Sequence, residues 1–325
     1  MTGEPRDPGH EPEAGEALRT IRRASAPRVW LQASRANSLA IATVGVLVGG
    51  AAAFWQGAAS WRLLLAWVGA AAAQAGTNLT NVSHNYKAGV GAADSSSDFE
   101  PDPGASSAVV WSGRLSEGKV RRAGWICFGV TVAAGLVLTV LCGWEILLFG
   151  LPGVAAGYFY AAPPLRLGRR ALGVPTVFLF MGPVMVTGSA FTVTLDFSLP
   201  ALAASIPVGL VAAGIMHVND LRDFEDDRAH GKRTVATLLG WDRAVSALAW
   251  IDGLAFALPA AWAAAGLLPW TVLLVLPTAP LALEQVRAVR DGTPERLEAA
   301  WRQGVKLHTG YGALLIAGLA AGALL

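Results

Sequence analysis

One polar stretch, residues 219–234, combines oxygen-bearing and basic side chains at spacings that favour a shared site. Three oxygen-bearing side chains stand at four-residue intervals within it: Asn219, Asp223 and Asp227. On an α-helix a four-residue step turns only about 40°, so these side chains would line one face. Carboxylates stacked in this way repel one another. A hard cation such as Mg²⁺ would relieve the repulsion, because it takes one or two carboxylates together with substrate phosphates.

Basic side chains accompany this row, and a bound diphosphate would require them. The candidates for contacting diphosphate are Arg222, Lys232 and Arg233. The plain alternative is a solvated connecting loop, which most charged runs are. Here the run follows directly on a long apolar segment, residues 199–218, and that position favours the functional interpretation.

The same residues carry a family resemblance. Asn219-xxx-Asp223-xxx-Asp227, followed by Gly231-Lys232-Arg233-Thr234, resembles the second aspartate-rich motif of the UbiA superfamily of intramembrane prenyltransferases. The similarity is greatest to the menaquinone branch, the dihydroxynaphthoate polyprenyltransferases. This resemblance implies a helical membrane enzyme that ionises a prenyl diphosphate with Mg²⁺ as cofactor.

The first motif of that family, Asn-xxx-Asp-xxx-Asp, is altered here. Counting from Asn81 places Asn85 and Gly89 where the two aspartates belong. Two carboxylates, Asp94 and Asp98, follow in the same loop and are candidate replacements. The resemblance thus implies a metal set comprising Asn81, Asn85, Asp94, Asp98, Asn219, Asp223 and Asp227. Lys87 of the same loop is a further candidate for contacting diphosphate. A plain polar loop is the alternative for the serine-rich part.

Two further stretches support the resemblance. Residues 107–116 resemble a Val-xx-Gly-xx-Ser pattern of the menaquinone branch, and Tyr160–Pro164 matches its Tyr-x-x-Pro-Pro feature. The aromatic residues at 158–160 would flank a carbocation, or else belong to an interfacial aromatic belt. Gly182-Pro183 predicts a kink in its helix. His217 is expected to be structural, whereas Asp252, within an apolar segment, has either a functional role or a bond to a neighbouring helix.

The bulk composition independently indicates a membrane protein. Hydrophobic residues make up 54% of the chain and charged residues 15%, against about 25% charged in soluble domains. Two cysteines and five scattered histidines give neither a disulfide framework nor a zinc site. The net charge of +2 says little about partners. The basic residues are signals of membrane topology and not a nucleic-acid-binding patch, and no protein partner is evident.

The apolar segments predict an all-α, polytopic membrane bundle of about nine transmembrane helices. Residues 1–28 are expected to form a disordered cytoplasmic tail, without a cleaved signal peptide. Residues 29–325 are expected to form a single UbiA-like domain embedded in the lipid bilayer. The predicted spans are 37–55, 61–77, 123–143, 146–163, 172–195, 199–218, 244–266, 268–284 and 307–325.

The basic residues predict the orientation. With a cytoplasmic N-terminus, only Arg62 of the 25 Lys and Arg residues falls on the outer side. Such a distribution obeys the positive-inside rule. It predicts a multi-pass protein of the cell membrane, with the N-terminus and the active-site loops cytoplasmic.

Three functions are compatible with these features. Because the altered first motif resembles that of UbiA-type terpene cyclases, we expect ionisation of a polyprenyl diphosphate within the membrane, followed by cyclisation of the allylic cation to a terpene. The alternative is a prenyltransferase that moves the prenyl group to an aromatic acceptor such as 1,4-dihydroxy-2-naphthoate. The third is a non-catalytic or transport protein. The intact second motif disfavours it, because such a protein need not keep that motif.

Overall fold

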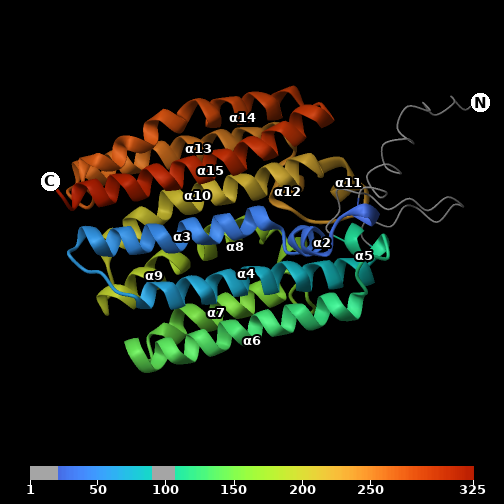
Figure 1. The fold of residues 1–325 in the computed structure, drawn as a ribbon. Coiled ribbons are helices and arrows are strands. Elements are labelled where there is room, and N and C mark those ends of the chain that lie inside the picture. The colour runs from blue at the N-terminus through green and yellow to red at the C-terminus, as the bar shows by residue number, and fades with distance from the viewer. Residues whose placement is uncertain (1–20, 90–106) are drawn as a thin grey trace, which may run out of the picture. The chain divides into compact units, whose positions relative to one another are not determined.

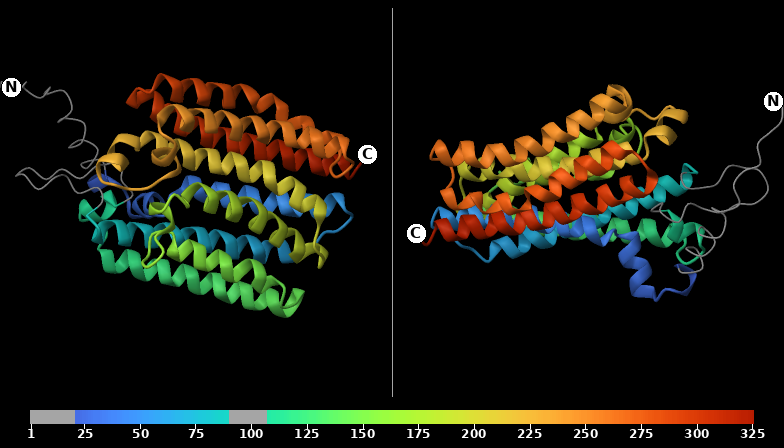
Figure 2. Two further views of the ribbon diagram at one scale, coloured as in Figure 1. Left: turned by 180° about the vertical axis from the view of Figure 1, so that it is seen from behind. Right: turned by 90° about the horizontal axis from the view of Figure 1, so that it is seen from above.

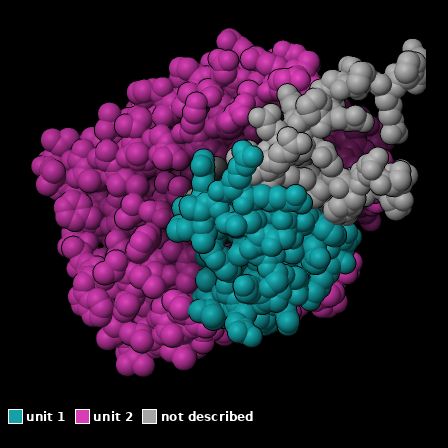
Figure 3. Space-filling view, turned by 45° about the vertical axis from the view of Figure 1, so that its right-hand side comes forward, with its two compact units in different colours: residues 1–36, 75–127 teal, residues 37–74, 128–325 magenta. Residues whose placement is uncertain are grey.

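The computed structural model describes residues 21–89 and 107–325, and its regular structure there is helical (Figure 1). Within these residues the β-type pairing consists of one bridge, between Arg170 and Arg233. The all-α prediction is therefore confirmed. Asp94 and Asp98 lie outside the described residues. The chain divides into two compact units, residues 1–36 with 75–127 and residues 37–74 with 128–325 (Figure 3).

The smaller unit is built on the ends of two long helices. It contains α2 (Ala26–Ala33), the end of α4 (Arg62–Lys87), α5 (Ala108–Trp111) and the start of α6 (Glu117–Cys142). Its apolar core joins Val29, Val82 and Val109 with their neighbours. Helix α2 begins at Ala26, because Pro27 favours the first turn of a helix. Its start therefore lies inside residues 1–28, which were expected to form a tail.

The larger unit contains the remaining helices. They are α3 (Ala36–Trp55), α7 (Ile146–Phe159), η1 (Leu167–Arg169), α8 (Gly173–Leu179), η2 (Phe180–Val184), α9 (Met185–Thr194), α10 (Leu199–Arg222), α11 (Phe224–Ala229), α12 (Val235–Leu239), α13 (Trp241–Ala264), η3 (Trp270–Thr278), α14 (Ala279–Asp291) and α15 (Pro294–Gly322). Together with α4 and α6, they place a helix, or a run of joined helices, at every predicted span.

Several of these helices are long and apolar enough to cross a membrane. Within the described residues, six segments meet that description: Ser38–Trp55, Glu117–Cys142, Gly173–Thr194, Leu199–Arg222, Trp241–Ala264 and Trp270–Asp291. Ile146–Phe159 is a shorter apolar helix. Helix α4 ends in the polar sequence Asn78–Lys87, and α15 begins with the polar sequence Pro294–Lys306. The chain is thus a multi-pass membrane protein.

Helix α10 positions the second motif, and most of its length is buried. Helices α13 and α15 pack against it, as do α8, η2 and α9 (Figures 1 and 2). Ser198 caps its start by accepting a hydrogen bond from the Ala201 amide at 3.0 Å. The apolar length of α10 therefore holds the polar residues at its C-terminal end in a fixed position.

At Gly182-Pro183, where the sequence predicts a kink, the helix has one π-helical turn, η2, between α8 and α9. Proline cannot donate the usual helical hydrogen bond, which explains the wider turn. A Cβ atom on Gly182 would lie 2.7 Å from both the Gly209 Cα and the Ser205 carbonyl oxygen of α10. Only glycine permits the two backbones to approach this closely.

Candidate active site

The aspartate row lies across a junction between two helices. Helix α10 ends at Arg222, Asp223 has the non-helical angles φ −92° and ψ 12°, and α11 begins at Phe224. The four-residue hydrogen-bond pattern nevertheless continues, from the Asp223 amide to the Asn219 carbonyl at 3.1 Å and from the Asp227 amide to the Asp223 carbonyl at 2.8 Å. The four-residue spacing of Asn219, Asp223 and Asp227 is therefore preserved across the junction.

Apolar packing fixes this junction. Val218, Leu221 and Phe224 belong to a buried cluster that also includes residues of α13, α14 and α15. The Phe224 ring meets Trp241 edge-on, with centroids 5.6 Å apart. The side chains between these apolar anchors are therefore held on a rigid support, which suits a binding site.

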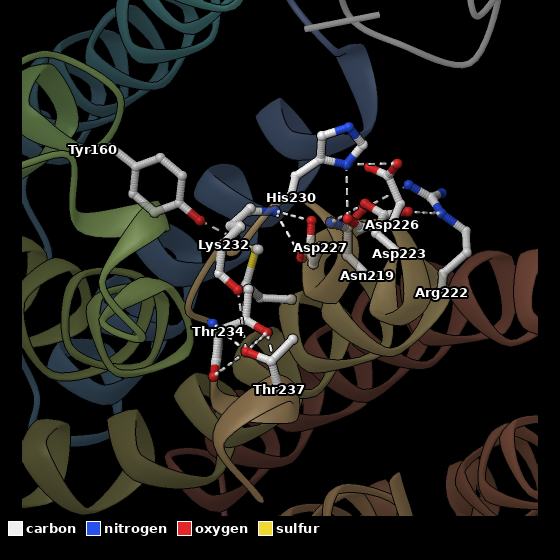
Figure 4. A network of polar contacts seen from close by, with 11 residues as sticks. Tyr160, Asn219, Arg222, Asp223, Asp226, Asp227, His230, Lys232, Thr234 and Thr237 are labelled. Carbon is white, nitrogen blue, oxygen red and sulfur yellow. Dashed lines mark hydrogen bonds and ion pairs between the residues drawn. The ribbon is translucent and has the colours of Figure 1, made fainter. Parts of the chain in front are cut away.

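Arg222 binds the first two members of the row. Its Nε lies 3.0 Å from Asp223 Oδ1, and its Nη2 donates to Asn219 Oδ1 at 2.9 Å (Figure 4). Its remaining terminal nitrogen, Nη1, lies 3.2 Å from Glu298 Oε2 on α15. The guanidinium thus links the motif to a helix far away in the sequence. Glu298 is a residue that the sequence analysis did not identify.

Lys232 binds the third member of the row. Its Nζ lies 2.8 Å from both carboxylate oxygens of Asp227 (Figure 4). Gly231, at φ +64°, turns the chain back so that the Lys232 amide also donates to the Asp227 carbonyl at 2.8 Å. Burial raises the pKa of the Asp227 carboxyl, and the ammonium of Lys232 opposes that rise.

The loop that follows is anchored on both sides. Thr234 and Thr237 form a reciprocal capping box at the start of α12. The Arg233 carbonyl accepts a hydrogen bond from the Ala171 amide at 2.7 Å, which fixes this loop to the one between α7 and α8. The side chain of Arg233 is exposed, unlike that of Lys232, which is partly buried.

Two residues near the row add to the site. Asp220 is 2% exposed, its Oδ1 has no hydrogen-bond partner among the described residues, and it lies within electrostatic reach of Lys232. Sequence reasoning missed Asp220, because it lies off the face defined by the four-residue spacing. Tyr160 places its hydroxyl 3.3 Å from the sulfur of Met216, one helical turn before Asn219 (Figure 4). Its tyrosine ring therefore lies beside the motif end of α10.

The candidates of the first motif belong to the smaller unit. Asn81 and Asn85 lie on α4, four residues apart, so they share a face. Asn81 is buried, and its Oδ1 has no hydrogen-bond partner within residues 21–89 and 107–325. Lys87 lies 3.1 Å from Glu117 of α6, which also accepts a hydrogen bond from Ser83 at 2.7 Å. Gly89, at φ +72°, lies just past the end of α4 at Lys87.

The donor set of the second motif fits a hard divalent cation. The row supplies one amide oxygen and two carboxylates, and each of these groups contacts a cationic nitrogen of Arg222 or Lys232. The site therefore accommodates positive charge. Among the described residues no three His, Cys, Asp or Glu side chains form a complete metal cage. That result is compatible with Mg²⁺, which usually keeps several waters and uses few carboxylates together with phosphate oxygens.

Two other polar residues of the apolar segments lie apart from the row. His217 is fully buried, and its Nε2 lies 2.8 Å from the Ala244 carbonyl oxygen, as a structural histidine would. Asp252 is buried, with neither carboxylate oxygen hydrogen-bonded within the described part of the chain. A Cβ on Gly214 of α10 would lie 3.4 Å from Asp252 Oδ1. Asp252 therefore faces α10.

These features define a class: a multi-pass helical membrane protein with a polar, metal-compatible site at the end of one buried helix. Residues 40–310 match the UbiA prenyltransferase family, and the chain belongs to that family. Membership confirms both the resemblance found in the sequence and the prediction of a prenyl-diphosphate enzyme.

Named relatives and solved structures agree with this assignment. The chain is 27% identical over 320 residues to the 1,4-dihydroxy-2-naphthoate octaprenyltransferase of Bacillus subtilis, covering 94% of this chain and 96% of that one. It is 31% identical over 268 residues to the enzyme of the same name from Mycobacterium tuberculosis, covering 81% and 86%. A UbiA homolog from Archaeoglobus fulgidus has the same fold, with a TM-score of 0.61, 16% identity and coverage of 91% and 100%. Another structure of that homolog, with a TM-score of 0.54, 15% identity and coverage of 89% and 99%, was solved with DMAPP and Mg²⁺.

Proposed function

We propose that this protein transfers a prenyl group from a prenyl diphosphate to an aromatic acceptor of the 1,4-dihydroxy-2-naphthoate type, with Mg²⁺ as cofactor. The observation that carries this proposal is the near full-length similarity to a relative named for that acceptor, covering 94% of this chain. The paired aspartates and their cations supply the chemistry that such a transfer requires. This reverses the order of the two functions expected from the sequence.

The cyclase alternative depends on the altered first motif, in which Asn85 and Gly89 stand where the family motif has two aspartates. Loss of these carboxylates alters a metal site but does not select the fate of the cation. The acceptor decides that fate, because an aromatic ring and an internal double bond compete for the same allylic carbon. The two functions are therefore separated by product analysis.

The residues of the second motif have distinct roles in this proposal. Asn219, Asp223 and Asp227 would hold Mg²⁺. When bound, the ion supplies charge neutralisation to the departing diphosphate. Lys232 and Arg222 donate to the diphosphate oxygens as negative charge develops on them, which lowers the barrier to ionisation.

The reaction breaks the bond between the allylic C1 carbon and the diphosphate oxygen. A ring carbon of the acceptor then forms a bond to C1 with a pair of its π electrons. A proton leaves that ring carbon, or carbon dioxide where the carbon bears the carboxylate, and the electron pair of the broken bond restores the aromatic ring. Water must be kept from the cation, because water would otherwise capture it. The Tyr160 ring, which lies beside the motif end of α10, is proposed to stabilise positive charge on the cation.

The remaining sequence candidates keep their proposed roles. Asn81 and Asn85, with Asp94 and Asp98, are proposed to supply ligands to a metal ion. Lys87 and Arg233 are proposed to contact diphosphate. In the described structure Lys87 is paired with Glu117, so its approach to diphosphate would require exchange of that partner.

We further propose that the N-terminus and the loops of both motifs face the cytoplasm of a cell membrane. The distribution of Lys and Arg supports this orientation. A topology reporter fused after Asp227 is expected to give a cytoplasmic signal. A signal from the opposite side would refute the orientation without affecting the chemistry.

Product analysis tests the function. Purified protein in lipid membranes is incubated with Mg²⁺ and geranylgeranyl diphosphate, with or without 1,4-dihydroxy-2-naphthoate. We expect a prenylated naphthalene product that requires the acceptor. A cyclic hydrocarbon formed without acceptor would instead establish the cyclase. The assay is repeated with prenyl diphosphates of other chain lengths. If neither product forms with any of them, a non-catalytic protein is favoured.

A further inference from the structure

The guanidinium of Arg222 is shared between the second motif and a helix that carries no motif residue. Each of its three nitrogens has a different partner: Nε lies 3.0 Å from Asp223 Oδ1, Nη2 lies 2.9 Å from Asn219 Oδ1 and Nη1 lies 3.2 Å from Glu298 Oε2. Glu298 lies in the second turn of α15, 76 residues after Arg222. One charged residue of α15 thus helps to hold the Arg222 side chain in place.

The sharing of charge has a consequence for Asp223. Asp223 Oδ1 faces the guanidinium, while Oδ2 faces the Asn219 amide nitrogen at 3.3 Å. With Glu298 present, one positive charge is divided between two carboxylates, and the three groups together carry a net charge of −1. Without the Glu298 charge the Arg222–Asp223 pair would be neutral. A divalent cation approaching Asp223 would then meet a weaker attraction.

We propose that Glu298 is a positioning residue for the metal site: it draws Arg222 toward α15 and so preserves the affinity of Asn219 and Asp223 for the divalent cation. This inference rests on the proposed function, in which those two residues hold Mg²⁺. Outer partners that orient metal ligands typically change metal affinity or activity by about 10- to 100-fold when removed. Glu298 occupies that kind of position, one side chain away from two ligands.

A purely structural role for Glu298 is disfavoured by its surroundings. Its side chain is 40% exposed and that of Arg222 is 32% exposed, and ion pairs this accessible to solvent contribute little to stability. Helix α15 is fixed instead by Leu297 and Ala300, which are buried in one apolar cluster with Leu221. The position of α15 against α10 therefore does not depend on the Glu298 charge.

The matched variants come from the same helix. Glu298→Gln keeps the size of the side chain and removes its charge. Glu295→Gln removes a charge one turn earlier, where the side chain is exposed and has no ion pair within the described residues. Arg302→Gln removes the other ion pair of Glu298, at 3.7 Å, and leaves Glu298 itself in place.

The first readout does not require turnover. The thermal unfolding midpoint of the detergent-solubilised protein is followed during titration with Mg²⁺ in the presence of inorganic diphosphate. We expect Glu298→Gln to need about 10-fold more Mg²⁺ than the wild type for the same stabilisation. Its midpoint without metal, and the titrations of Glu295→Gln and Arg302→Gln, should match those of the wild type.

The second readout is the Mg²⁺ dependence of prenyl transfer. We expect Glu298→Gln to raise the half-saturating Mg²⁺ concentration by about 10-fold, while excess Mg²⁺ restores kcat to within about twofold. A folding defect would not be restored in this way. In an Arg222→Gln background, adding Glu298→Gln should change the half-saturating concentration little, because the second residue acts through the first.

The outcomes are distinct. The inference would be overturned if Glu298→Gln required the same Mg²⁺ concentrations as the wild type. It would also be overturned if excess Mg²⁺ did not restore kcat, or if Arg302→Gln had the same effect as Glu298→Gln. If the wild type fails to transfer a prenyl group, the proposed function fails, whereas the stabilisation by Mg²⁺ and diphosphate still tests Glu298. Absence of any such stabilisation in the wild type would overturn the inference itself.

Discussion

Lys232 places its ammonium nitrogen 2.8 Å from both carboxylate oxygens of Asp227. The side chain of Asp227 is 5% exposed and that of Lys232 is 25% exposed, so each charge depends on the other in place of water. Burial raises the pKa of the Asp227 carboxyl, and the ammonium of Lys232 opposes that rise. The proposed function uses both members of the pair, Asp227 for the metal and Lys232 for the diphosphate.

Removal of Lys232 should reduce stability as well as turnover. Lys232→Ala leaves the buried Asp227 carboxylate without its partner, which is expected to cost about 3 kcal/mol of unfolding free energy. Arg233→Ala, one residue later, removes an exposed side chain and should change stability by about 0.5 kcal/mol or less. Unfolding of the two variants in detergent measures the difference. Equal losses would show that the Lys232–Asp227 pair contributes nothing particular to stability.

The two aspartates of the row should be indispensable for catalysis. Asp223→Asn and Asp227→Asn keep the side-chain volume but remove charge from the metal site, so each should lower kcat by about 100-fold or more. Asp226→Asn is the matched control, because Asp226 is exposed and its ion pair is with His230. Its rate should stay within about twofold of the wild type. Near-normal rates for both row variants would refute the site assignment.

The altered first motif gives a separate prediction. If Asp94 has replaced a lost ligand, Asp94→Ala should disable the enzyme as Asp223→Asn does, because Mg²⁺ requires carboxylate charge that Asn81 and Asn85 do not supply. Asn85→Asp should be tolerated, since it restores the ligand usual in the family. Steady-state rates at several Mg²⁺ concentrations measure both effects. Normal turnover by Asp94→Ala would exclude the relocated ligand.

The close approach of η2 and α10 should make Gly182 sensitive to any side chain. Gly182→Ala would place a Cβ atom 2.7 Å from backbone atoms of α10, and overpacking of this kind is expected to cost about 1–3 kcal/mol. Gly253→Ala in α13 is the control, because no atom lies within 4 Å of its Cβ position. Comparison of thermal unfolding midpoints tests the contrast. A stable Gly182→Ala protein would mean that the helices separate at little cost.

Membrane helices and the second motif were predictable from the sequence because both are local patterns. Apolar length identifies a span, and four-residue spacing places Asn219, Asp223 and Asp227 on one side of the chain even though a helix boundary falls at Asp223. The boundary itself was missed. Backbone hydrogen bonds across the junction maintain the spacing, so the spacing gives no sign of the break.

Contacts between distant helices were not predictable in the same way. Glu298 contacts Arg222, which lies 76 residues earlier in the chain. The sequence around Glu298 is that of an ordinary charged helix start. Glu117 similarly binds Lys87 from another helix. Spacing rules apply within one element, whereas these ion pairs depend on how elements pack. Alignment of homologues would have been the natural signal for them.

Diphosphate release, measured together with prenylated acceptor in one preparation, tests the central claim most directly. Membranes containing the protein receive Mg²⁺ and geranylgeranyl diphosphate, and 1,4-dihydroxy-2-naphthoate is either supplied or omitted. The proposed function predicts about one diphosphate released per prenylated naphthalene, with release falling to background when the acceptor is omitted. Sustained diphosphate release without acceptor, accompanied by cyclic hydrocarbon, would contradict it.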